Sequence, residues 1–171
     1  MKVGVVILCL MSALWAGWSL GAAHMALWAY IPAGLLALGP MILTYDRRFP
    51  DASAEKARRV RRLVGLAILF EAVVIAAGVP WLGRAGRPDL IVCLVAMAVG
   101  LHFFPLARGL PMPKYYLTGL ALLVAAGAGL VLPAADRVVL VAASGAAILW
   151  LTALSIVLAL PRLSSRRAPI S

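Results

Sequence analysis

Six long apolar runs limit what this chain can fold into more than any other feature of its sequence. A transmembrane helix needs about 20 apolar residues to cross about 30 Å of hydrocarbon, and each run comes close to that length. The runs are continuous rather than alternating and are too long for the strands of a membrane barrel, which disfavours strands. Backbone groups in lipid must be hydrogen-bonded within their own segment, so the runs must be helices. The sequence therefore predicts an all-α, polytopic membrane helical bundle with spans at residues 3–22, 27–44, 63–82, 90–107, 116–132 and 138–160.

The composition excludes a soluble globular domain. Hydrophobic residues make up 64% of the 171 residues and charged residues 13%, whereas soluble domains are about 45–50% apolar and about 25% charged. A fold in water could not bury so much apolar surface, so lipid must be the solvent. We expect a single transmembrane domain over residues 1–171.

The net charge of +10 is distributed along the chain as an orientation signal. If the N-terminus is cytoplasmic, all but three of the 16 basic residues lie in inner segments, and the exceptions are Arg84, Arg87 and Arg137. Cytoplasmic segments of membrane proteins carry an excess of Lys and Arg, so both termini are predicted to be cytoplasmic. We expect the lipid bilayer and its anionic headgroups as partners of this charge, and no nucleic acid.

The first run carries two features of its own. Gly17 and Gly21 allow two helices to approach closely, and we expect this contact within the bundle rather than in a dimer. The small residues at 21–23 are also compatible with a signal-peptide cleavage site. The apolar run is longer than the usual core of a signal peptide, so we expect it to remain as a helix.

Residues 46–62 form the long polar connection before the third run. A helix is expected to begin there near Ala52 and to continue into the membrane. Each Lys or Arg near an acidic membrane surface contributes about 1 kcal/mol of attraction, although such a charge run could also serve only to orient the protein. The predicted headgroup contacts are Arg58, Arg59, Arg61, Arg62 and Lys114.

Glu71 is an acidic residue in the middle of the third apolar run. An ionisable side chain at that depth costs about 2.5–3.5 kcal/mol on insertion scales, and such residues usually mark a proton, ion or substrate path. His102 lies on the next, antiparallel run, and a rise of 1.5 Å per residue places the two within about 5 Å in depth. The sequence therefore predicts a station for a proton, an ion or a substrate at Glu71 and His102.

Other polar residues are candidate accessories to this station. Arg108, at the inner boundary, could turn inward as a counter-ion or outward to lipid phosphate. Three hydroxyl groups near one face of the sixth run either join helices or line a polar path, and they belong to Ser144, Thr152 and Ser155.

The remaining polar residues do not form the motif of a common enzyme. Asp89 and Asp136 lie at the starts of the fourth and sixth runs and are expected to be helix caps. Cys9 and Cys93 lack the spacing of a metal or redox site, and no phosphate loop or nucleophile motif is present. We expect no catalytic residue, no cofactor and no metal, which favours a protein without enzymatic activity.

The segment GLHFFPLARGLPMPKYYLTG, from Gly100 to Gly119, resembles a block found in small uncharacterised bacterial multi-pass membrane proteins. The shared pattern is GLHFxPLA followed by YYxTG, and the resemblance extends to Glu71 and to GRPDLIV, from Gly86 to Val92. It covers the middle third of the chain. The resemblance implies a six-helix type of protein in the bacterial inner membrane and no known activity.

The sequence is compatible with three functions. In the first, the chain is a transporter or channel for a small solute, a cation or a proton. In the second, it is a non-catalytic membrane subunit or scaffold, in a homo-oligomer or with a membrane partner subunit, and Glu71 and His102 only fix helix packing. In the third, it is an intramembrane enzyme or a lipid-binding protein that uses its basic inner surface.

Overall fold

The computed structural model describes residues 2–47, 54–110 and 112–161. In these ranges the chain forms six α-helices and three short 3-10 turns, with no strand. Each of the six helical segments is long and apolar enough to cross a membrane, so the predicted all-α bundle is confirmed. The α-helices are α1 (Lys2–Ala22), α2 (Tyr30–Ile42), α3 (Ala54–Arg84), α4 (Ile91–Gly109), α5 (Lys114–Val131) and α6 (Ala134–Leu158), and the turns are η1 (Leu27–Ala29), η2 (Leu43–Asp46) and η3 (Pro88–Leu90).

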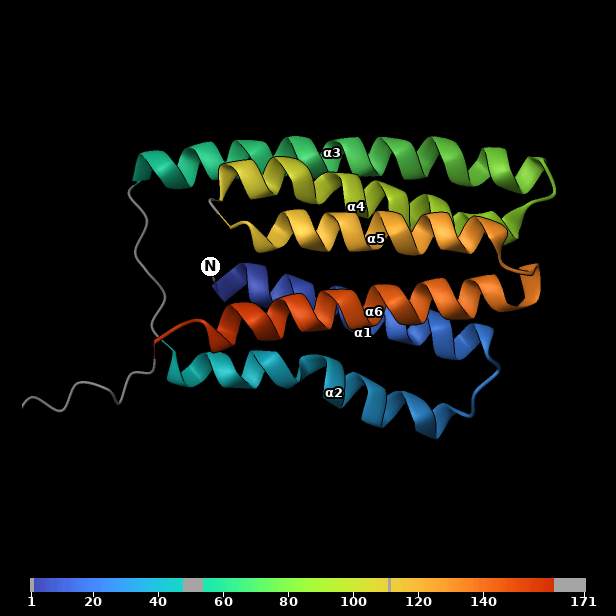
Figure 1. The fold of residues 1–171 in the computed structure, drawn as a ribbon, viewed down its shortest axis with the longest axis horizontal. Helices are drawn as coiled ribbons and strands as arrows, with labels where there is room; N and C mark the ends of the chain where they lie inside the picture. Colours follow the sequence, from blue (N-terminus) through green and yellow to red (C-terminus); the bar gives the residue numbers. More distant parts are fainter. Residues whose placement is uncertain (1, 48–53, 111, 162–171) are drawn as a thin grey trace, which may run out of the picture.

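The third span differs most from its predicted limits. The α3 helix has 31 residues, which corresponds to about 46 Å at 1.5 Å per residue and exceeds the roughly 30 Å of a hydrocarbon core. It begins at Ala54, close to the predicted start at Ala52, which lies outside the described residues. The α3 helix therefore reaches beyond its neighbours at the end of the bundle where α1 begins (Figure 1).

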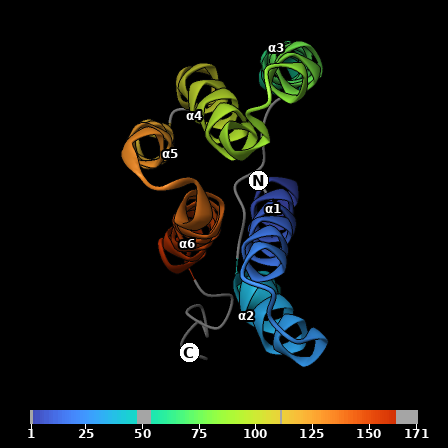
Figure 2. The same ribbon diagram turned by 90° about the vertical axis from the view of Figure 1, so that its right-hand side faces the viewer.

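The helices are arranged in the spatial order α3, α4, α5, α6, α1, α2 when the bundle is viewed end-on (Figure 2). Each neighbour in this order packs on the next, and α6 also contacts α4 and α2. The α2 and α3 helices therefore lie at the two ends of the arrangement, and α3 packs mainly on α4. The start of α1 and the end of α6 lie at the same end of the bundle (Figure 1).

The contact between α1 and α6 combines small residues with a hydrogen bond to the backbone. A Cβ on Gly145 would lie 2.5 Å from the Trp15 ring, so only glycine leaves room for the indole. One residue further along α6, the Ala146 carbonyl accepts a hydrogen bond of 2.9 Å from the Ser12 hydroxyl. Small residues and such hydrogen bonds are the usual contacts between helices in lipid.

Gly100 on α4 and Gly119 on α5, the first and last residues of the segment singled out in the sequence, touch. A Cβ on Gly119 would lie 2.7 Å from the Gly100 carbonyl oxygen, so the two backbones meet without side chains between them. Aromatic rings pack between the same helices nearer the turn. These pairs are Phe103 with Tyr115 and Phe104 with Tyr116, at centroid distances of 5.5 and 5.9 Å.

A proline in α2 is compensated by a side chain from α6. Pro40 has no N–H, so the carbonyl of Leu36 loses its helical hydrogen bond. The Trp150 Nε1–H donates a hydrogen bond of 2.8 Å to this carbonyl. No water is available in hydrocarbon to satisfy a free carbonyl, so the indole stabilises α2 where the proline weakens it.

Candidate functional site

Two tight contacts set the register of the antiparallel helices α3 and α4. Gly109, at the end of α4, faces Leu63, and Gly78 faces Leu94 near the start of α4. In each contact a Cβ on the glycine would collide with the leucine side chain. Glu71 lies midway between Leu63 and Gly78. Its depth is therefore defined by packing on both sides.

The structure brings Glu71 and His102 together. His102 Nδ1 lies 2.7 Å from Glu71 Oε2, a distance typical of a charge-assisted hydrogen bond. With Nδ1 protonated, the imidazole donates to the carboxylate, and a second proton on the ring makes the contact an ion pair. The Glu71 side chain is 25% exposed and the His102 side chain 13%. The pair lies at the edge of the α3–α4 contact and is not sealed on all sides.

One face of α3 is covered by the protein, and Glu71 lies on that face. Ala67 and Leu82, on the same side of the helix, are buried, whereas Leu69 and Val73 on the opposite side are exposed. Only 6% of the apolar window of α3 is buried, compared with 22–44% in the other five spans. The bundle contacts α3 along one side only, and the Glu71–His102 pair is a polar contact on that side.

The predicted accessory Arg108 lies at the inner end of α4 and is exposed. It is six residues from His102, or about 9 Å along the helix. Among the described residues, its guanidinium makes no hydrogen bond or ion pair with Glu71. The structure therefore places Arg108 at the end of α4, at the level where Leu63 meets Gly109.

The other predicted accessories belong to a separate contact between α5 and α6. The Thr152 hydroxyl lies 2.8 Å from the Thr118 hydroxyl, and the Ser155 hydroxyl donates to the Thr152 carbonyl at 2.9 Å. The ammonium group of Lys114 donates to the Ser155 carbonyl at 2.6 Å. Ser144 is half-buried on the same helix. The Thr118–Thr152 and Lys114–Ser155 hydrogen bonds join α5 to α6, whereas the Ser155 hydroxyl bonds within α6.

The predicted headgroup residues on α3 point outward where they are described. Arg58, Arg61 and Arg62 are exposed. The side chain of Arg59 lies outside the described part of the structure. Lys114, the remaining member of the predicted set, uses one of its N–H groups inside the bundle and keeps two more for other partners.

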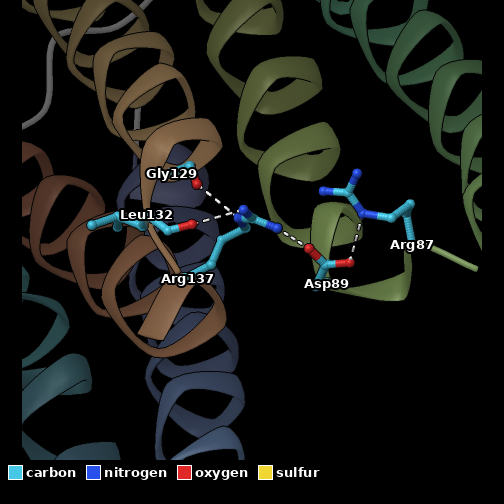
Figure 3. Close-up of polar contacts among 5 residues, drawn as sticks. All are labelled: Arg87, Asp89, Gly129, Leu132 and Arg137. Carbon is cyan, nitrogen blue, oxygen red and sulfur yellow. Dashed lines mark hydrogen bonds and ion pairs between the residues drawn. The ribbon is translucent and has the colours of Figure 1, made fainter. Parts of the chain in front are cut away.

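An ion pair that the sequence analysis missed lies at the opposite end of the bundle (Figure 3). Arg137 is only 5% exposed, and it donates to the carbonyls of Gly129 and Leu132 at 2.7 Å each. These carbonyls lie at the C-terminal end of α5, where the N–H donors four residues on are lacking; the Gly129 carbonyl also accepts the Leu132 N–H at 3.3 Å. The same guanidinium pairs with Asp89, whose other oxygen lies 3.3 Å from Nε of Arg87.

The expected role of Asp89 as a helix cap is therefore wrong. The start of α4 and its preceding turn have no side-chain cap, because the carboxylate is engaged by Arg137 instead. The same applies to Asp136, since α6 begins without a side-chain cap. The sequence does show opposite charges near the starts of α4 and α6, at Asp89 and Arg137. Spacing along the chain does not reveal which of these charges meet.

A groove of about 460 Å³ opens between α1, α2 and α6. Neither Glu71 nor His102 is among the residues that line it. Alanine and leucine form most of its wall, and its polar side chains are Ser12, Ser19 and Trp150. Each of these three already donates a hydrogen bond to a backbone carbonyl. The groove therefore presents apolar surface.

Comparison of the chain with family models, with curated proteins and with solved structures finds no match. Among the described residues, no three His, Cys, Asp or Glu side chains are grouped closely enough to hold a metal ion. The function must accordingly be inferred from the geometry of the polar residues within the bundle.

Proposed function

We propose that this integral membrane protein is a transporter or channel for a proton, a cation or a small solute, and that Glu71 and His102 form its proton-binding station. The supporting observation is the 2.7 Å contact between His102 Nδ1 and Glu71 Oε2, midway along two apolar helices. Ionisable residues at such a depth usually mark a path for protons, ions or substrates. In this proposal the protein resides in the bacterial inner membrane, in line with the resemblance carried by residues 100–119.

The pair can hold one proton more or one fewer than its neutral form. It has no net charge in two forms, a carboxylate beside an imidazolium or a carboxylic acid beside a neutral imidazole. Gain of a proton makes the pair cationic, and loss of a proton makes it anionic. A net charge is costly in a medium of low dielectric constant, so each change favours exchange with another cation or onward transfer of the proton.

The partial exposure of both side chains supports access to the pair. Glu71 keeps 25% of its side-chain surface and His102 keeps 13%. In this proposal the proton reaches the carboxylate from the edge of the α3–α4 contact, where the protein leaves part of both side chains uncovered. Neither residue lines the apolar groove between α1, α2 and α6.

A second candidate function is that of a non-catalytic membrane subunit or scaffold. The observation that favours it is the position of α3, which packs mainly on α4 and has little of its apolar window buried. In that case the hydrogen bond between Glu71 and His102 serves to hold α3 at a defined depth and rotation.

Proton flux through the reconstituted protein distinguishes the two functions. The full chain is placed in proteoliposomes, a pH gradient is imposed, and the internal pH is followed with a trapped dye. The Glu71→Gln variant retains a hydrogen-bonding side chain of the same shape but cannot carry a proton. We expect it to abolish the proton flux of the wild-type protein while its thermal stability stays close to the wild-type value.

Thr118→Val is the matched control, because it removes another intramembrane hydrogen bond without changing a protonatable group. We expect this variant to keep its proton flux. If Glu71→Gln and the wild-type protein dissipate the gradient equally, Glu71 is excluded as the proton-binding station, and its hydrogen bond keeps only the structural role that the subunit function gives it. The same conclusion follows if wild-type proteoliposomes leak no faster than empty ones over a range of imposed gradients.

A further inference from the structure

The side of α3 that faces away from α4 changes from basic to apolar along its length. Six exposed residues recur at intervals of three or four, so they lie on one side of the helix. We call this side the outer face of α3. It consists of Arg58, Arg61, Arg62, Gly65, Leu69 and Ala72.

The change in character coincides with the end of the neighbouring helix. Leu63 packs against Gly109, the last residue of α4. The three arginines therefore lie at or beyond the end of α4, whereas Gly65, Leu69 and Ala72 lie alongside its apolar part. The arginines are thus at the depth of a headgroup layer and the apolar residues at the depth of acyl chains.

The outer face offers phosphate donors followed by an open apolar surface. Guanidinium groups bind phosphate oxygens through paired N–H donors. Further along the helix, a Cβ on Gly65 would meet no atom within 4 Å. An extended hydrocarbon chain can therefore lie against the backbone at this position. A phospholipid has the same order, with an anionic headgroup followed by an acyl chain.

A second copy of the chain is a poorer occupant of the same face. Two copies in one membrane share their orientation, so a symmetric contact through this face would be isologous. It would place the three arginines of one copy at the depth of the same three in the other, and like charges at close range repel. An acidic lipid removes this repulsion by charge complementarity.

We propose that the outer face of α3 binds an anionic phospholipid, with its phosphate on Arg58, Arg61 and Arg62 and an acyl chain along Gly65, Leu69 and Ala72. This lipid site does not depend on proton transport by Glu71 and His102, which lie on the opposite side of the helix. It is a defined binding surface, beyond the general attraction of a basic segment to an acidic membrane.

Native mass spectrometry of the full chain, released from detergent with phosphatidylglycerol or phosphatidylcholine added, tests the site. We expect the wild-type protein to retain phosphatidylglycerol in preference to phosphatidylcholine. Substitution of all three arginines by glutamine should weaken phosphatidylglycerol binding by at least about tenfold, since the charge-assisted contacts to the phosphate are lost and 1.4 kcal/mol is a factor of ten. Work in detergent separates binding from any effect of charge on membrane orientation.

Two matched controls lie at the other end of the same helix. Arg84→Gln removes an exposed arginine there, and we expect lipid retention to be unchanged. Gly65→Leu should reduce retention by occupying the position of the acyl chain. Gly83→Leu should leave retention unchanged. Gly83 is equally open and lies on the same side of the helix, but it is at the end of α3 away from the three arginines.

Several results would overturn the lipid site. One is equal retention of phosphatidylglycerol by the wild-type protein and the triple arginine variant. Another is an equal loss in Arg84→Gln and Arg62→Gln, which would indicate charge attraction without a defined site. A lipid-free wild-type dimer that the triple variant does not form would assign the face to a second copy. Circular dichroism of each variant checks that the helices are retained.

Discussion

Arg137 on α6 and Asp89 in η3, just before α4, form an ion pair that joins two turns at one end of the bundle (Figure 3). The arginine also caps the end of α5 through the carbonyls of Gly129 and Leu132. One buried side chain thus connects three helices at the outer end. Its energetic importance can be measured directly, because a more exposed arginine contacts the same carboxylate.

Arg137→Gln should lower the free energy of unfolding by about 3–5 kcal/mol, because it leaves Asp89 without its buried partner. Arg87→Gln is the control, since the Arg87 side chain is 53% exposed and exposed pairs contribute about 0–1 kcal/mol. Unfolding by a denaturing detergent in mixed micelles measures both. Equal losses in the two variants would contradict the structural role of Arg137.

Glu71→Leu should destabilise the protein by about 1–3 kcal/mol, because it leaves a partly buried nitrogen of His102 unpaired. Replacing both residues by leucine should restore most of this loss, since removing both partners of a buried hydrogen bond can be nearly neutral. A double-mutant cycle on unfolding free energies gives the coupling energy. Additive losses in the cycle would show that the two side chains do not interact.

Gly119→Ala should separate α4 from α5, because the new Cβ would lie 2.7 Å from the carbonyl oxygen of Gly100. A backbone atom cannot rotate away as a side chain can, so we expect a loss of about 1–3 kcal/mol, as for other overpacked cores. Gly127→Ala on the same helix meets no atom within 4 Å and should not be destabilising. Thermal unfolding measures the stability of both variants. A Gly119→Ala variant as stable as the wild-type protein would contradict the close contact.

Trp150→Phe should cost about 1–3 kcal/mol by leaving the Leu36 carbonyl without a donor. Pro40→Ala restores the missing backbone N–H at the position that normally serves that carbonyl. In the Pro40→Ala background, Trp150→Phe should therefore cost much less. Unfolding free energies of the four proteins test this dependence, and equal costs in the two backgrounds would indicate that the hydrogen bond contributes little.

Topology reporters fused after residues 48, 85, 110 and 135 should read inside, outside, inside and outside. The expectation follows from the six spans and from the excess of basic residues in the inner segments. A consistent reversal would move Arg58, Arg61 and Arg62 to the outer surface and would remove the basis for an inner-leaflet lipid on α3.

The sequence by itself determined the number of spans and the depth of individual residues. Run length and rise per residue are local quantities, so the six helices and the similar depths of Glu71 and His102 follow without tertiary information. The structure shows the two side chains in contact, and their role in moving protons stays a prediction. Lys114 was assigned to lipid on the same local grounds, although its ammonium also binds the Ser155 carbonyl.

Only the tertiary structure decided which surfaces meet. In water, burial follows from hydrophobicity, but in lipid an apolar side chain is equally stable against acyl chains and against another helix. The span of α3 is as apolar as that of α6, yet 6% of its apolar window is buried against 44% in α6. The partners of Trp150, Gly119 and Arg137 likewise depend on helix order, which apolar periodicity in a membrane protein does not encode.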